Sequence, residues 1–90
     1  MLVLPAELTH EHAAAISRML GQGVRTDSAR AVVADAAALS RFDSSALAVL
    51  LDCRREALAQ GKTFSVRGLP PRLRVLAGLY GVAELLPATP

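Results

Sequence analysis

The sequence predicts a small α/β domain in which helices pack on a largely parallel sheet. Four apolar runs alternate with three helical patterns along the 90 residues. Strands and helices that alternate at this spacing are typical of βαβ units, and right-handed crossovers place successive helices on one face of the sheet. The length corresponds to one domain, which we assign to residues 1–90.

The first strand is predicted at Leu2–Leu4, and Pro5 ends it because proline donates no ladder hydrogen bond. In the helix that follows, Thr9 is the expected N-cap, and Glu11 lies in the first turn, where the helix dipole favours an anion. The apolar face of this helix consists of Ala13, Ile16, Met19 and Leu20. We expect the helix to stop at Gly21–Gly23.

The second strand is predicted at Ala31–Ala34, a continuous apolar run that ends near Asp35. Continuous runs suit a strand that is covered on both faces. The alternative is a single helix over residues 29–41, because Ala36–Leu39 extends the run and alanine is the best helix former. The strand is favoured because the next segment carries a helix cap of its own.

That segment is Asp43–Ser45, whose residue types are the preferred helix caps. Apolar residues then recur at helical spacing, at Ala46, Val49, Leu50, Cys53 and Ala57, and the stripe is widened by Leu47, Leu51 and Leu58. The first two turns are apolar nearly all round, which predicts a largely buried helix. Its second half is polar, and Gly61 closes it.

The third strand is predicted at Thr63–Arg67, where polar and apolar residues alternate. Pro70–Pro71 then suits the first turn of a helix. The expected buried face of this helix consists of Leu73, Leu76, Ala77 and Tyr80. Gly81 ends the helix, and the last apolar run, Val82–Leu86, is predicted to form a short strand.

The composition excludes several classes of protein. Apolar residues make up 52% of the chain, which is too many for a disordered tail, and only three residues are aromatic, which is too few for a base-stacking platform. A single cysteine supports neither a disulfide framework nor a zinc knuckle within the chain. The longest stretch without charged residues is nine residues, whereas a membrane helix needs about 20. With no secretory signal at its start, the chain is expected to be cytoplasmic and not inserted into a membrane.

The charge is unevenly distributed. Residues 1–50 carry four basic and five acidic groups, a net −1, while residues 51–90 carry six basic and three acidic groups, a net +3. The arginines are scattered over separate predicted elements and form no dense stripe. This pattern favours a solvated face with a modest docking role over nucleic-acid binding.

Few residues suggest catalysis or metal binding. In His10-Glu11-His12 the zinc-protease pattern would need its second histidine at position 14, which is alanine, so we interpret these residues as solvated. Cys53 falls on a buried stripe, where thiols are usually inert. Without a nucleophile–base pair, a metal set or a phosphate loop, we expect no enzyme activity and no cofactor.

Asp43-Ser44-Ser45 is the strongest candidate site. It follows a strand and a loop at the edge of the predicted sheet, where ligands and partners usually bind. Two hydroxyls at a helix N-terminus also suit a phosphoryl group, which the dipole and the free N–H groups stabilise. A plain helix cap and a functional serine both remain open at this point.

The segment resembles the central signature of STAS domains, which are named for sulfate transporters and anti-sigma-factor antagonists. Val32–Asp35, Leu39 and Phe42–Leu47 follow the family pattern: an apolar strand that ends in Asp, an apolar residue, then D-[ST]-[SGA]-G-L opening a helix. Glu7-Leu8 is similar to the family's early turn. The resemblance implies a β/α sandwich with a mostly parallel mixed sheet of about four strands and helices on one side. The extra N-terminal strand of many STAS domains is missing or very short here, so a sheet edge is expected to be exposed.

The C-terminal half is similar to the MlaB branch of this family. Leu39–Asp43, Gln60-Gly61, Val66-x-Gly68, Leu76–Tyr80 and Leu86-Pro87 carry that likeness. The branch forms a cytoplasmic subunit of the Mla ABC transporter, which moves phospholipid between the two membranes of Gram-negative cells. The likeness implies a non-catalytic, bacterial subunit, peripheral to the inner membrane, that binds an MlaF-like ATPase and supports outer-membrane lipid asymmetry.

The resemblance assigns roles to individual positions. Ser44 matches the phosphorylated serine of anti-sigma-factor antagonists and a threonine on the ATPase-binding surface of the Mla branch, and Asp43, Ser45 and Ala46 match its neighbours. Ala46 departs from the family glycine, and its methyl group is expected to narrow the approach of a partner and so to disfavour kinase docking. The docking face is expected to extend over Leu47, Arg54, Arg72, Arg74, Leu79 and Tyr80. The alternative function is an antagonist whose partner is an anti-sigma kinase that phosphorylates Ser44.

Overall fold

A computed structural model describes residues 1–89. Its elements, in chain order, are β1 (Leu2–Val3), β2 (Glu7–Leu8), α1 (Ala13–Thr26), β3 (Ala31–Asp35), β4 (Arg41–Phe42), α2 (Ser45–Ala59), β5 (Thr63–Arg67), α3 (Pro71–Leu79) and the 3₁₀ helix η1 (Ala83–Leu85). The order of the three main strands and three α-helices is the predicted one. Within these residues no helix is long and apolar enough to cross a bilayer.

The main sheet has the strand order β1-β3-β5, and both of its strand pairs are parallel. The register pairs Leu2 with Ala34 and Ala31 with Thr63. The short strands β2 and β4 also pair in parallel, further along the chain from β1 and β3. The predicted α/β fold class is confirmed, and all strand pairing recorded for residues 1–89 is parallel rather than mixed.

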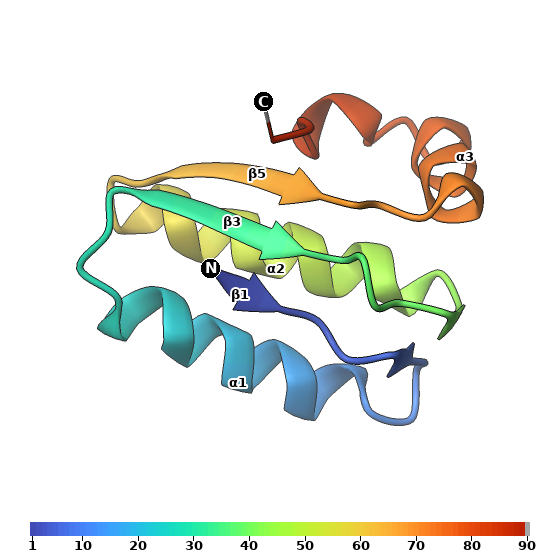
Figure 1. The fold of residues 1–90 in the computed structure, drawn as a ribbon, viewed down its shortest axis with the longest axis horizontal. Helices are drawn as coiled ribbons and strands as arrows, with labels where there is room; N and C mark the ends of the chain where they lie inside the picture. Colours follow the sequence, from blue (N-terminus) through green and yellow to red (C-terminus); the bar gives the residue numbers. More distant parts are fainter. Residues whose placement is uncertain (90) are drawn as a thin grey trace.

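Helices α1 and α2 lie side by side, and α3 lies past the carboxyl end of β5 (Figure 1). The strands bury alternate residues: Val32 and Ala34 of β3 and Phe64 and Val66 of β5 are at most 8% exposed. Their neighbours on the other face, such as Ser65, are only half-buried. One face of the sheet therefore packs on the helices, as successive right-handed crossovers require.

The start of α1 differs from the prediction. The helix begins at Ala13, its N-cap position is His12, and no side chain caps it. Thr9 instead accepts a backbone hydrogen bond from His12 N at 3.1 Å, and Glu11 precedes the helix. The expected Thr9 cap and first-turn Glu11 are therefore wrong, because a backbone turn at residues 9–12 starts the helix one turn later.

The end of α1 also differs, because the helix runs through both glycines to Thr26. A Cβ added at Gly23 would lie 3.0 Å from Leu2 Cδ2, so the glycine lets the helix approach β1 closely. Lys62 Nζ donates to the carbonyl oxygen of Val24 at 2.6 Å and also to that of Asp27. Lys62 thus satisfies carbonyl groups at the end of the helix, so the helix does not need to end at a glycine as predicted.

One further expectation is confirmed and two are corrected. The favoured second strand is confirmed over its alternative, a single helix over residues 29–41, since β3 ends at Asp35 and Asp35 Oδ1 accepts the Ala37 N–H in a turn at 3.0 Å. The last apolar run forms η1 and not a strand; the next segment meets the β5 edge, where Thr89 N donates to Val66 O at 2.9 Å. Tyr80 is 61% exposed and Leu58 is 49% exposed, so neither belongs to the core.

Candidate functional site

Asp43 organises the start of α2. Its Oδ1 accepts the backbone N–H of Ser45 at 2.8 Å, which satisfies one of the free donors at the helix N-terminus. Its Oδ2 accepts the backbone N–H of His10 at 3.0 Å and lies 3.2 Å from His10 Nδ1. The carboxylate therefore ties the loop before α2 to the loop before α1.

These two backbone donors, His10 first and Ser45 second, lower the pKa of Asp43 from 3.8 to about 2. A negative charge at a helix N-terminus is also favoured by the helix dipole. Ser44 occupies the N-cap position, but its side chain makes no capping hydrogen bond. Since Asp43 does the capping, the exposed hydroxyl of Ser44 is not used by its own helix.

Next to Ser44 the surface opens into an apolar pocket of about 350 Å³. Residues of α2 and of the turn after α3 line it: Ser44, Leu47, Ala48, Leu51, Tyr80 and Val82. Gly81 has φ +72°, a left-handed conformation that favours glycine, and the turn there allows both Tyr80 and Val82 to face α2. Two segments separated by a strand and a helix therefore build one concave surface.

The predicted site residues fall into two groups. Ser44, Leu47 and Tyr80 line the pocket together, while Asp43, Ser45 and Ala46 form the helix start beside it. Ala46 is 0% exposed, so its methyl group packs into the core. The expectation that this methyl group narrows the approach of a partner is wrong.

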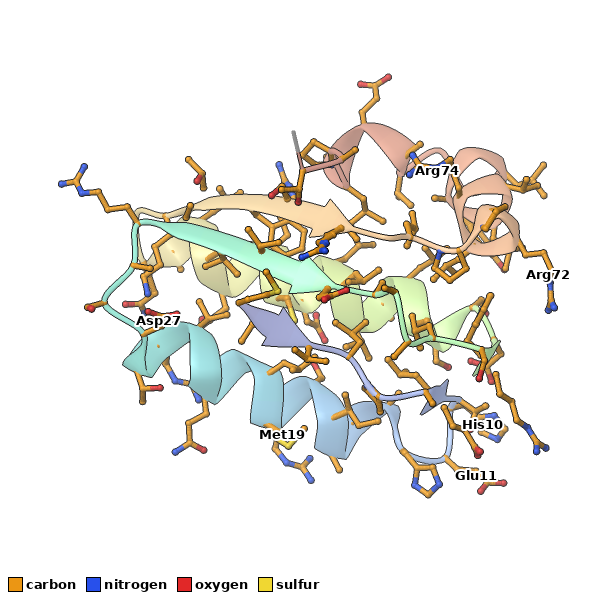
Figure 2. The ribbon with its side chains drawn as sticks, viewed as in Figure 1. His10, Glu11, Met19, Asp27, Arg72 and Arg74 are labelled. Carbon is orange, nitrogen blue, oxygen red and sulfur yellow. The ribbon has the colours of Figure 1, made fainter. Side chains whose placement is uncertain are left out.

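The predicted arginines are more dispersed. The guanidinium of Arg72 lies over the ring of Phe42, 5.2 Å from its centroid, close to the start of α2. Arg54 lies on α2 one turn beyond Leu51. Arg72 and Arg74 point to different sides of α3 (Figure 2), as expected for residues two apart on a helix. Leu79 is 77% exposed but does not line the pocket.

Sequence reasoning missed part of the site. Ala48, Leu51 and Val82 line the pocket, and Leu51 was assigned to the core stripe. The signal was present, because positions 44, 47, 48 and 51 recur at i, i+3, i+4 and i+7 on a second face of the helix. The contact between His10 and Asp43 spans 33 residues and had no local signal.

The site contains no recognisable catalytic or metal centre. Across residues 1–89 no group of three His, Cys, Asp or Glu side chains is placed to hold a metal ion. The Cys53 thiol is 1% exposed, and burial is the main cause that raises its pKa to about 11. What the arrangement offers is a shaped apolar surface with one exposed hydroxyl at a helix start, as binding sites commonly have.

Comparison with known proteins gives a consistent result. The family model described as "Mlab, STAS domain" matches residues 1–87. A putative anti-sigma factor antagonist from Thermotoga maritima is structurally similar, with a TM-score of 0.78 at 14% identity, covering 96% of this chain and 75% of that one. The anti-sigma factor antagonist SpoIIAA, solved in its unphosphorylated form, gives a TM-score of 0.74 at 19% identity, covering 98% and 76%. No curated protein matches the chain.

The two structural likenesses establish the fold, and the family match extends over nearly the whole chain, including the strand, loop and helix that carry Asp43 and Ser44. This chain belongs to the STAS domain family.

Proposed function

We propose that the chain is a non-catalytic STAS subunit of a Mla-type phospholipid-transport ABC complex, and that it binds the ATPase subunit of that complex on the cytoplasmic side of the inner membrane. The observation that carries the proposal is the pocket that joins Ser44 on α2 to Tyr80 after α3. The exposed side chain of Tyr80 lines an apolar hollow there, and Leu79, the residue before it, is also exposed. Contiguous exposed apolar surface of this kind marks a protein interface.

The Mla assignment is supported by the family model that matches, because its description names Mlab. The sequence likeness at Leu76–Tyr80 points to the same branch. The role as a partner subunit also suits the chemistry of the site, which has an exposed hydroxyl but no catalytic or metal-binding group beside it.

The test is binding to the purified cognate ATPase subunit, measured by calorimetry. Ser44→Arg places a long charged side chain at the pocket wall, and we expect it to weaken binding at least about tenfold, since an interface core tolerates an unpaired charge poorly. Ser28→Arg makes the same substitution in the exposed loop after α1 and should bind as the wild type does. The proposal fails if the wild type does not bind or if Ser44→Arg binds equally well.

The second candidate is an anti-sigma-factor antagonist that is switched by phosphorylation of Ser44. It is favoured by one observation: Ser44 is exposed, and Asp43 does the capping that would otherwise engage its hydroxyl. A phosphate there would add about two negative charges beside the Asp43 carboxylate, and like-charge repulsion would change the docking face.

Mass spectrometry after incubation with the cognate anti-sigma kinase and ATP tests this second candidate. One phosphate is expected on wild type and on Ser45→Ala, and none on Ser44→Ala. Unmodified wild-type protein, or modification at Ser45, would reject the switch at Ser44.

A further inference from the structure

The shape of the pocket points to the kind of partner segment that fits it. Its α2 wall consists of Ser44, Leu47, Ala48 and Leu51, which lie at i, i+3, i+4 and i+7. This spacing is the one by which a helix presents a face to another helix. Because α2 rises about 1.5 Å per residue, the wall runs along the helix for about 10 Å, or two turns. An amphipathic helix that lies along α2 and places one bulky apolar side chain in the hollow matches this shape.

The charges around the pocket indicate which helix it would be. Both acidic residues of α2 are turned toward α1: Asp52 accepts a hydrogen bond from Ser17 Oγ at 2.9 Å, and Glu56 accepts one from Arg25 Nη1 at 2.6 Å. Asp52 Oδ1 also lies 3.4 Å from Arg55 Nη1, so both carboxylates of α2 are engaged within the chain, by Ser17, Arg25 and Arg55. Asp43 is at the helix start, where its oxygens are occupied by His10 and Ser45.

Arginines lie near both ends of the α2 segment that lines the pocket, although neither is itself a lining residue. Arg72 is held over the Phe42 ring, two residues before Ser44, and Arg54 follows Leu51 by one turn. Neither has a carboxylate within 4 Å among residues 1–89. An arginine that stacks on a ring keeps its N–H groups available for a carboxylate. The acidic residue Glu84, in η1, follows the pocket-lining Val82 by two residues.

We infer that the docking face accepts an amphipathic helix of the partner protein whose apolar anchor is flanked on both sides by acidic residues. The anchor, a side chain of leucine or phenylalanine size, fills the hollow between α2 and Tyr80. The flanking carboxylates meet Arg72 near the start of α2 and Arg54 beyond Leu51. This inference rests on the proposed function, because both assign the surface around Ser44 and Tyr80 to a protein partner. It adds the chemistry of the partner segment that binds there.

Two stapled 18-residue helical peptides provide the test with the full chain. Each has one phenylalanine and one leucine on a single face, with glutamates as flanking residues in one peptide and lysines in the other. Fluorescence anisotropy at low salt should show the glutamate peptide binding about tenfold more tightly, with a preference that shrinks as salt screens the charges. In Arg54→Glu/Arg72→Glu the preference should reverse. Arg18→Glu/Arg30→Glu, a matched charge change at two exposed arginines on α1 and in the loop before β3, should leave it unchanged.

Equal affinity of the two peptides for the wild type, or no binding of either, would overturn the inference. Dimers that form in sedimentation experiments and exclude the glutamate peptide would also overturn it, because the occupant would then be a second copy of the chain. The ATPase is absent from these measurements, so the two proposals fail separately. If the chain prefers the glutamate peptide but does not bind the ATPase, the inference about the partner helix stands and the proposed ATPase partner is rejected. If the chain binds the ATPase and Arg54→Glu/Arg72→Glu does not weaken that binding, the proposed function stands and the inference about the partner helix is rejected.

Discussion

Replacing Leu50 by alanine tests the packing that holds the docking helix in place. Leu50 is 0% exposed and lies in the core among side chains from the sheet and the helices. Truncation of a buried leucine to alanine costs about 2.7–5 kcal/mol, because the lost transfer free energy adds to that of the cavity left behind. A chain of 90 residues has a total stability of roughly 5–13 kcal/mol, so this one substitution removes a large part of it.

Leu58→Ala on the same helix is the matched control. Leu58 is 49% exposed, so its truncation should cost less than about 1 kcal/mol. Leucine and alanine have similar helix propensities, and the propensity difference is the same in both variants. The contrast between the two variants therefore reports burial alone.

Urea denaturation followed by circular dichroism measures both variants. We expect Leu50→Ala to lower the denaturation midpoint with little change in slope, and to lower the Tm by roughly 11–40 °C, since 1 kcal/mol corresponds to about 4–8 °C in a domain of this size. Leu58→Ala should shift the Tm by a few degrees at most. If both variants lost the same stability, or if Leu50→Ala lost under about 1 kcal/mol, the assignment of the buried face of α2 would be refuted.

Three further outcomes are expected. Gly68→Ala should be destabilising for two reasons: φ at Gly68 is +67°, and the added Cβ would lie 2.9 Å from Ala37 Cβ. Gly61→Ala, with φ +71° and no atom within 4 Å of the added Cβ, should cost only the backbone strain of about 1–2 kcal/mol. Equal losses of stability for the two variants in urea denaturation would contradict the clash at Gly68. The lowered pKa of Asp43 gives stability that is present above about pH 4 and is lost as the pH falls through about 2. In Asp43→Asn the Tm should therefore depend less on pH between these values than in the wild type, and Tm curves of the two proteins that run parallel against pH would reject this. Cys53, whose pKa is raised to about 11, should react with maleimide at pH 8 only after unfolding, and rapid labelling of folded protein would contradict its burial.

The main elements were predictable because local and tertiary preferences agree there. In β5, the alternation of Phe64 and Val66 with polar residues matches a strand with one buried face. The second strand was harder, since Ala36–Leu39 has the composition of a helix. Asp35 resolves the ambiguity by accepting the Ala37 N–H, which turns the chain out of the strand before a helix can form.

Where prediction failed, a long-range contact outweighed a local preference. Glycine in a helix interior costs about 1 kcal/mol, which is why a stop was expected at Gly21–Gly23. The close approach of α1 to Leu2 requires a small residue, and Lys62, far along the chain, donates to the final carbonyl groups of α1. Neither contact can be predicted from the sequence of α1 alone, because both partners lie outside the helix.

The candidate site was half predictable for the same reason. The match of Ser44 to a family signature, together with the apolar residues Leu79-Tyr80, predicted a docking region, and the structure brings Ser44 and Tyr80 to one pocket. The face of α2 that lines this pocket looked like core, because helical spacing shows that a face is apolar but not what covers it. Leu51 packs against the core and also lines the hollow, whose opposite wall is built by Tyr80 and Val82 around the turn at Gly81.

Because Asp43 caps the helix, the Ser44 hydroxyl at the start of α2 is available without leaving the helix end unsatisfied. A helix N-terminus needs an acceptor for its free N–H groups, and a serine that supplies it has its hydroxyl committed. Here Asp43 accepts the Ser45 N–H, and its second oxygen, bonded to His10, fixes the loop in place. Ser44 can then meet a partner or carry a phosphate while the helix keeps its cap. By this reasoning, a change at Asp43 disturbs folding and docking together, whereas a change at Ser44 disturbs docking alone.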